Sequence, residues 1–223
     1  MTNVSTVKKV ALLLMPILAP LTVYWILSTG TSQLGQEIGF GLGYGFYWIF
    51  WCLVFPIWLV GSKGLKQMFR SVPNPFGKPA WWGALILLIP IVAAYFFVRF
   101  LGADEEMVPQ SIIVLVIGTI LMSLWNGTLE EILWRGSFIQ IFPKRAFLGF
   151  LYPALGFSLW HFGPFLALYS WDTQKAIVLF IGGTLFGLCW NWIAAKTGSI
   201  RLATYSHILS NIVLMLTEGL MVL

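Results

Sequence analysis

Three short polar motifs interrupt an otherwise apolar sequence and carry the residue types that water activation requires. In chain order they are Glu130-Glu131 with Arg135, Phe157 with His161, and His207 with Asn211. A carboxylate can take a proton from water, an imidazole can hold and polarise that water, and an imidazole with an amide can donate hydrogen bonds to an oxyanion. The chain has only two histidines, and both lie in these motifs.

Helical spacing indicates which of these side chains could act together. Glu131 and Arg135 are four residues apart, so they share a helix face and can pair. Glu130 projects about 100° away from Glu131, so it can face the interior of a helix bundle while the arginine holds its neighbour. The other two motifs also span one helical turn each, which places both members of each motif on one face.

Each motif also has a purely structural interpretation. Glu131 and Arg135 could form an interfacial ion pair, with the arginine reaching the lipid headgroups. His161 could make a hydrogen bond between helices, as could His207 and Asn211, at about 0.6 kcal/mol per bond. However, ionised side chains at a bilayer centre cost about 2.5–3.5 kcal/mol each. Three such motifs on separate spans therefore favour a shared functional site.

The elements that must position these motifs are membrane-spanning helices. Of the 223 residues, 59% are hydrophobic and 9% are charged, against about 25% charged in soluble domains. So few charges cannot coat a soluble globule. We expect an all-α, polytopic transmembrane helix bundle of about seven spans, each about 20 residues long. The expected spans are Val10–Leu27, Ile38–Val60, Ala80–Leu101, Ser111–Leu133, Leu148–Tyr169, Lys175–Ala195 and Leu202–Leu223.

Two local features refine this model of the spans. Gly163-Pro164 should kink or end the fifth span, because proline removes a helical hydrogen bond. Glycines at four-residue spacing in the second and sixth spans should let helices approach closely; they are Gly39, Gly41, Gly43, Gly45, Gly183 and Gly187. We treat the chain as one membrane domain, with N-terminal helices over residues 1–110 and the polar motifs within 111–223.

The loop charges predict a cytosolic N-terminus and an outside C-terminus, since basic residues gather in cytosolic loops. The loops expected on the cytosolic side hold Lys63, Lys66, Arg70, Lys78, Lys144, Arg145, Lys196 and Arg201. The opposite loops hold Asp104, Glu105, Glu106 and Asp172, with Lys175 as the exception. Membrane topology thus explains the basic residues behind the net charge of +5, so we expect no nucleic-acid partner. Lys8 and Lys9 before a long apolar run indicate a retained signal anchor.

The three motifs, in their order and on separate spans, resemble the signature of the CPBP family. This family contains the type II CAAX prenyl endopeptidases and bacterial bacteriocin-processing or immunity proteins. The turn Thr197-Gly198-Ser199-Ile200 is also similar to the family. The resemblance covers roughly residues 111 to 215, and a chain of this length without an appended domain is typical of a prokaryotic member in the cell membrane.

The resemblance implies a glutamate-dependent intramembrane endopeptidase without a cofactor. Glu130 would be the general base, and His161 would help to hold the water. His207 and Asn211 would stabilise the oxyanion, while Glu131 and Arg135 would hold the site together. In an alternative version Glu130, His161 and His207 would bind zinc and leave one position for water. The absence of an HExxH motif and the presence of the His–Asn pair favour catalysis without a metal.

The expected substrate is a membrane-associated or lipidated protein or peptide, such as a CAAX protein or a bacteriocin or peptide precursor, cleaved from the cytosolic side. A non-catalytic immunity or scaffolding protein of the same fold is the first alternative. A small transporter or proton relay is the second, because buried Glu and His also serve that role. No internal repeat of the transporter kind is evident in the sequence.

Overall fold

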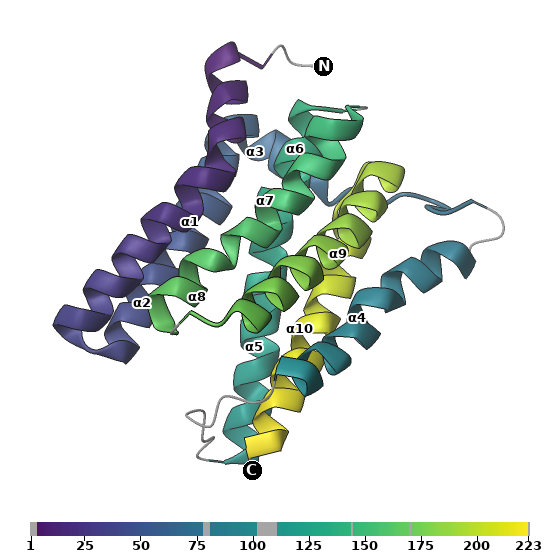
Figure 1. Cartoon of the computed structure of the whole chain (residues 1–223). Helices are drawn as coiled ribbons and strands as arrows, with labels where there is room; N and C mark the ends of the chain where they lie inside the picture. Colours follow the sequence, from purple (N-terminus) through teal and green to yellow (C-terminus); the bar gives the residue numbers. More distant parts are fainter. Residues whose placement is uncertain (1–3, 78–80, 102–110, 144, 170, 223) are drawn as a thin grey trace.

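The computed structural model describes residues 4–77, 81–101, 111–143, 145–169 and 171–222, and every element within these ranges is helical. Seven helical segments correspond to the seven expected spans (Figure 1). The expected topology markers Lys78, Asp104, Glu105, Glu106 and Lys144 lie outside the described residues. The all-α transmembrane bundle predicted from composition is therefore confirmed.

The helices follow one another along the chain with short breaks. The first half contains α1 (Thr6–Leu34), α2 (Gln36–Phe46), the π-helical segment η1 (Tyr47–Val54), α3 (Phe55–Met68) and α4 (Trp81–Leu101). The second half contains α5 (Ile112–Glu131), the π-helical η2 (Ile132–Gly136), α6 (Ser137–Ile141), the π-helical η3 (Phe147–Leu151), α7 (Tyr152–Trp160), α8 (Phe162–Leu168), α9 (Thr173–Thr197) and α10 (Arg201–Val222). Consecutive segments such as α2, η1 and α3 form one continuous span.

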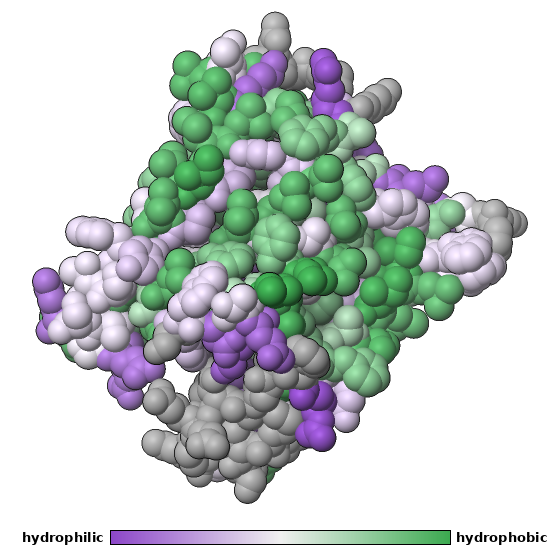
Figure 2. All heavy atoms as spheres, viewed as in Figure 1, coloured by the Kyte–Doolittle hydropathy of each residue, from purple (hydrophilic) through white to green (hydrophobic). Residues whose placement is uncertain are grey.

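Five of these segments are long and apolar enough to cross a membrane within the described ranges. They are Thr6–Leu34, Gln36–Met68, Trp81–Arg99, Ile112–Ile141 and Thr173–Thr197. The remaining two expected spans are α7–α8, which is interrupted, and α10, which carries the polar His207 motif. A broad apolar surface covers the flank of the molecule (Figure 2). The chain is an integral, multi-pass membrane protein.

Side-chain caps define where several spans begin. The Ser111 hydroxyl accepts a hydrogen bond from the Val114 amide at 3.2 Å, and the Asp172 carboxylate accepts one from the Lys175 amide at 3.0 Å. Such caps satisfy amides that the first helical turn leaves unpaired. Gly198, with φ of +63°, ends α9 in the left-handed conformation that glycine adopts without penalty. It turns the chain back into α10.

The fifth span breaks at His161, three residues before the proline that causes the break. α7 ends at Trp160 and α8 begins at Phe162. Pro164 has no amide proton for the Trp160 carbonyl, and its ring clashes with a carbonyl four residues earlier. The predicted interruption at Gly163-Pro164 is thus confirmed, with the irregular residue one turn upstream. This break places His161 at the junction of two helices.

Glycines allow two pairs of helices to pack in close contact, as their spacing predicts. In α2, Gly39 lies against Thr31 of α1 and Gly43 lies against Leu27, whereas Gly41 and Gly45 face open space. In α9, a Cβ on Gly187 would lie 3.0 Å from the Cα of Ala154, and one on Gly183 would lie 3.1 Å from the Cα of Ser158. The α1–α2 and α7–α9 contacts therefore depend on small residues.

Gly39→Ala and Gly41→Ala should have opposite effects on stability. At Gly39 the new methyl would overlap the backbone nitrogen of Thr31, so helices α1 and α2 must separate. Overpacking of this kind costs about 1–3 kcal/mol. At Gly41 the methyl meets nothing within 4 Å, and alanine improves helix propensity by up to about 1 kcal/mol. Thermal unfolding in detergent measures both, and equal melting temperatures would contradict the observed packing.

Candidate active site

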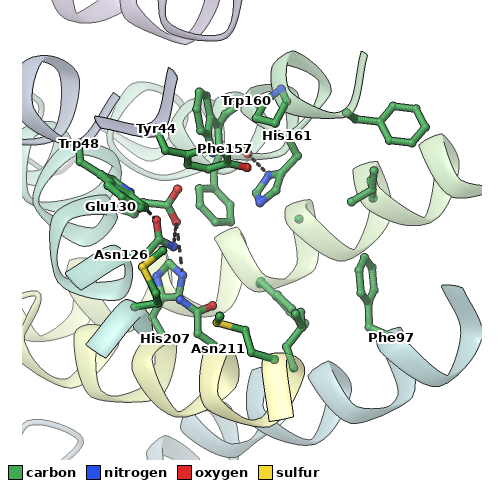
Figure 3. A pocket seen from close by; sticks show the side chains of 18 of the residues that line it. Tyr44, Trp48, Phe97, Asn126, Glu130, Phe157, Trp160, His161, His207 and Asn211 are labelled. Atoms are coloured by element: carbon green, nitrogen blue, oxygen red, sulfur yellow. Dashed lines mark hydrogen bonds and ion pairs between the residues drawn. The ribbon is translucent and has the colours of Figure 1, made fainter. Parts of the chain in front are cut away.

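Glu130 lies on the last turn of α5, at the inner end of a cavity of about 410 Å³. His161 from the α7–α8 junction and His207 and Asn211 from α10 line the same cavity. Figure 3 shows their side chains converging around it, with Glu130 and His207 adjacent and His161 across from them. The four residues that the sequence singled out are therefore brought together from three separate spans.

The Glu130 carboxylate is almost fully buried, at 3% exposure, and both of its oxygens accept hydrogen bonds. The Tyr47 hydroxyl donates to Oε1 at 2.9 Å, and the Asn126 amide donates to Oε2 at 3.1 Å. The His207 Nε2 atom lies 3.5 Å from Oε2. A carboxylate held at both oxygens in this way has a fixed orientation toward the cavity.

The two donors to Glu130 are themselves held by indole groups. Trp48 donates to the Asn126 carbonyl oxygen at 2.9 Å, and Trp134 donates to the Tyr47 hydroxyl oxygen at 2.8 Å. The accepted bond from Trp134 turns the Tyr47 proton toward Glu130, because a hydroxyl has a single proton to donate. This Glu130 network, Trp48–Asn126–Glu130–Tyr47–Trp134, joins η1 to α5 and η2.

Glu131 points away from Glu130 and binds a different pair of groups. Its Oε1 atom lies 3.0 Å from Arg135 Nη1 and 2.9 Å from His207 Nδ1. Since a carboxylate only accepts, the His207 Nδ1 atom donates to Glu131, which leaves Nε2 facing Glu130 and the cavity. The predicted Glu131–Arg135 pair is present, and it also orients the histidine.

The Arg135 guanidinium is fully enclosed by protein. The side chains of Arg135 and Glu131 have 0% exposure, so the interpretation of this pair as an interfacial one with Arg135 reaching the headgroups is wrong. The guanidinium carbon lies 4.3 Å from the Phe157 ring centroid and 5.0 Å from that of Trp190. Arg135 belongs to η2, which starts immediately after Glu131; π-helical turns of this kind are frequent at functional sites.

The His161 ring is fixed by its own helix. Its Nδ1 atom lies 2.8 Å from the Phe157 carbonyl oxygen, which can only accept. In the neutral ring Nδ1 therefore carries the proton and Nε2 is left as an acceptor. The Phe157 ring packs edge-on against both histidines, at 4.8 Å from His161 and 5.9 Å from His207. Within this motif His161 thus supplies a polar ring, and Phe157 packs against both histidines.

Trp190 completes the wall behind His207. The indole and imidazole rings stack at 3.9 Å between centroids with an interplanar angle of 14°. The Trp190 indole nitrogen donates to the Ser206 hydroxyl at 3.1 Å, which fixes the indole. With Glu131 at one ring nitrogen and Trp190 on its face, His207 has little freedom to rotate. Asn211 follows one turn later on α10 and lines the same cavity.

Several residues of the site were not identified from the sequence. Asn126 stands one turn before Glu130, so the four-residue spacing that linked Glu131 to Arg135 could have pointed to it. Tyr47, Trp48 and Trp134 gave no such signal, because the chain has 12 tryptophans and 7 tyrosines and interfacial belts account for them. The site also draws on residues 1–110 through Tyr47, so it is not confined to 111–223.

The cavity extends from Glu130 toward one end of the bundle. It runs past Tyr44 and Phe165 to the exposed rings of Phe40 and Tyr169. Phe40 belongs to the first half of α2 and Tyr169 directly follows α8, and these segments lie away from the end of the molecule that carries the N-terminus (Figure 1). Toward the other end, the interior is filled by fully or almost fully buried side chains; they are Leu133, Trp134, Phe138 and Met68.

The zinc alternative requires Glu130, His161 and His207 to converge on one ion. Within the described parts of the chain, no three His, Cys, Asp or Glu side chains are grouped closely enough to hold a metal. The Nδ1 atom of each histidine is bonded, at 2.9 Å from Glu131 for His207 and at 2.8 Å from the Phe157 carbonyl for His161, and this leaves both Nε2 atoms toward the cavity. The described side chains thus form no metal-binding group of three, and catalysis without a metal stays a prediction.

Comparison with known families agrees with the motif analysis. Residues 110–213 match the family model described as type II CAAX prenyl endopeptidase Rce1-like, close to the segment 111–215 that carries the resemblance. No match was found among curated proteins or solved structures. The assignment to the CPBP family, made from three motifs, is confirmed by this match of residues 110–213 to the Rce1-like type II CAAX prenyl endopeptidase model.

Proposed function

We propose that this protein is an intramembrane endopeptidase that uses Glu130 as its general base and hydrolyses a membrane-associated or lipidated protein or peptide. Membership in a protease family supports peptide-bond hydrolysis as the reaction class. The observation that carries the proposal is the position of Glu130. Its carboxylate is fixed by Tyr47 and Asn126, adjoins His207, and opens onto a cavity that His161 and Asn211 also line.

The proposed reaction follows from the donors and acceptors around the cavity. Glu130 takes a proton from water while the Nε2 atom of His161 accepts a hydrogen bond from the same water. The water oxygen attacks the peptide carbonyl carbon and forms a tetrahedral oxyanion. Asn211 donates to this oxyanion, as does the Nε2 atom of His207 when its ring is protonated. Glu130 then passes its proton to the amine as the C–N bond breaks, which balances the hydrolysis.

The direction of the cavity suggests how a substrate arrives. With the N-terminus in the cytosol, as the loop charges favour, the rings of Phe40 and Tyr169 at the mouth lie in the outer half of the membrane. The opposite route is filled by buried side chains. We therefore propose that the peptide enters from the outer half of the bilayer, rather than from the cytosolic side that we expected from the sequence. The aromatic lining favours apolar residues around the cleaved bond.

Replacement of Glu130 by glutamine tests the base directly. Glu130→Gln keeps the shape and can still accept a hydrogen bond from Tyr47, but its amide nitrogen cannot accept from Asn126 and the side chain cannot take the proton, so processing should fall by about 10²–10⁴-fold. Comparative proteomics of membrane-associated peptides and C-termini, in cells with wild-type or variant protein, measures the loss and identifies the substrate. Glu37→Gln, at an exposed glutamate of α2, is the matched control and should leave the termini unchanged.

If cells with Glu130→Gln keep every terminus and the full biological activity, the catalytic proposal fails. The protein would then act as a non-catalytic immunity or scaffolding member of its family. A transport role would appear instead as ion or solute flux in proteoliposomes that Glu130→Gln abolishes without any change in peptide termini.

Tyr47→Phe should slow turnover without weakening substrate binding. The change removes one hydrogen bond to a buried carboxylate, and bonds to charged groups contribute about 1.5–3 kcal/mol. We expect kcat to fall about 10- to 100-fold with little change in KM, because Tyr47 orients Glu130. Rates on the substrate found by proteomics measure this, and Tyr24→Phe on the lipid-facing side of α1 serves as control. A change in KM alone would rule out a positioning role.

A further inference from the structure

A second cavity, of about 360 Å³, lies at the end of the bundle near the N-terminus. It is formed by the end of α3 and the loop that follows, the C-terminal turn of α9 and the start of α10. Two arginines, Arg70 and Arg201, line it together with the hydroxyl-bearing Ser71 and Tyr205 and the apolar Leu202. We name it the arginine cavity; it shares no lining residue with the cavity around Glu130.

The walls of the arginine cavity are fixed to one another through Ser199. Its hydroxyl lies 3.0 Å from the Met68 carbonyl oxygen and 2.8 Å from that of Arg70. The Ile200 amide donates to the same Met68 carbonyl at 2.8 Å. These bonds join the end of α3 to the start of α10, two segments about 130 residues apart in sequence. Hydrogen bonds between distant segments of the chain thus hold the walls of the cavity together.

Each arginine is held in place without a carboxylate. The Arg70 guanidinium packs on the left-handed turn at Gly198, where any Cβ would overlap it. The Arg201 Nε atom donates to the Tyr205 hydroxyl at 3.2 Å, and the guanidinium lies 5.9 Å from that ring. Among the described residues neither arginine has an acidic partner: the acidic side chains placed by the structure are Glu37, Glu130, Glu131, Asp172 and Glu218.

The positive charge of the two arginines is therefore available to an anion from outside the protein. Exposed Lys63, Lys66 and Lys196 lie on the neighbouring ends of α3 and α9 and add to the positive field. The N-terminus of α10, with its partial positive charge, faces the same side. Hydrophilic residues lie at this end of the molecule and also toward the opposite end, with a largely apolar flank between them (Figure 2), as expected for the two levels of lipid headgroups.

We propose that the arginine cavity binds the phosphate of an anionic membrane lipid. Guanidinium groups donate paired hydrogen bonds that match phosphate oxygens, and the hydroxyl of Ser71 can supply a further donor. The apolar Val72 and Leu202 suit the glycerol and upper acyl carbons. Basic pockets between spans at the cytosolic face take lipid headgroups in this way. The bound lipid would fasten α3 to α10, the helix that carries His207 and Asn211.

Lipid binding by the purified full chain tests this proposal without reference to catalysis. Protein in neutral detergent is titrated with phosphatidylglycerol or with phosphatidylcholine, and bound lipid is counted by native mass spectrometry alongside thermal unfolding. We expect phosphatidylglycerol to bind and to raise the melting temperature, and phosphatidylcholine to do neither. The double variant Arg70→Gln/Arg201→Gln should lose at least about tenfold in affinity for phosphatidylglycerol.

Lys63→Gln/Lys66→Gln is the matched control, because it removes the same charge from the same end but leaves the cavity intact. Equal losses in the two double variants would mean diffuse attraction and overturn the site. Stabilisation by inorganic phosphate but not by the lipid would overturn the lipid assignment. Should the arginine double variant fail to fold, Arg70→Lys, which keeps charge but not the paired geometry, should still weaken binding; unchanged binding in Arg70→Lys would then count against the proposal.

Discussion

A carboxylate inside an apolar helix bundle is stable only where its oxygens are hydrogen-bonded, because an ionised group without partners in such surroundings is strongly unfavourable. Glu130 meets this condition through Tyr47 at one oxygen and Asn126 at the other. The structure around it follows from this constraint. η1 must bring Tyr47 against the end of α5, and Trp134 must direct the tyrosine proton. A base fixed in this way needs little rearrangement to meet a water molecule.

The second glutamate, Glu131, is stabilised differently: its Oε1 atom lies beside the positive charge of Arg135 and accepts from His207, while Oε2 is buried without a hydrogen-bond partner. Glu131 and Arg135 are enclosed together, and truncating one partner of such a pair leaves an uncompensated buried charge. The pair also orients His207, because Glu131 binds one of its ring nitrogens while the Trp190 indole stacks on the ring. Two adjacent glutamates thus have distinct roles. One faces the cavity and can exchange a proton, while the other neutralises an arginine and holds an imidazole.

The sequence predicts the parts of this arrangement that depend on helical period and polarity. Three polar motifs in long apolar spans indicate which helix faces meet, and Pro164 indicates the break that frees His161. The sequence does not predict the Glu130 network. Tyr47 lies more than 80 residues from Glu130, and one tyrosine inside a span that is rich in aromatic residues carries no signal of its own. Nor does spacing reveal η2, since Glu131 and Arg135 would pair equally well on a regular helix.

The two ends of the bundle have different chemistry. At one end the cavity around Glu130 opens past exposed aromatic rings, and at the other end Arg70 and Arg201 have no carboxylate partner among the described residues. α10 connects the two, since it begins beside Arg70 and carries His207 and Asn211. The hydrolysis that we propose requires that water reach Glu130 while the surface that faces lipid stays apolar.

The hydrogen bond between Tyr47 and Glu130 is the central claim, and a double-mutant cycle measures it most directly. The free energy of unfolding in detergent is determined for wild type, Tyr47→Phe, Glu130→Leu, which removes the acceptor, and the double variant. A buried bond to a carboxylate predicts a coupling free energy of about 1–3 kcal/mol. The same cycle with Glu37→Gln should give a coupling near zero. A coupling near zero for Tyr47 and Glu130 as well would contradict this account of the site.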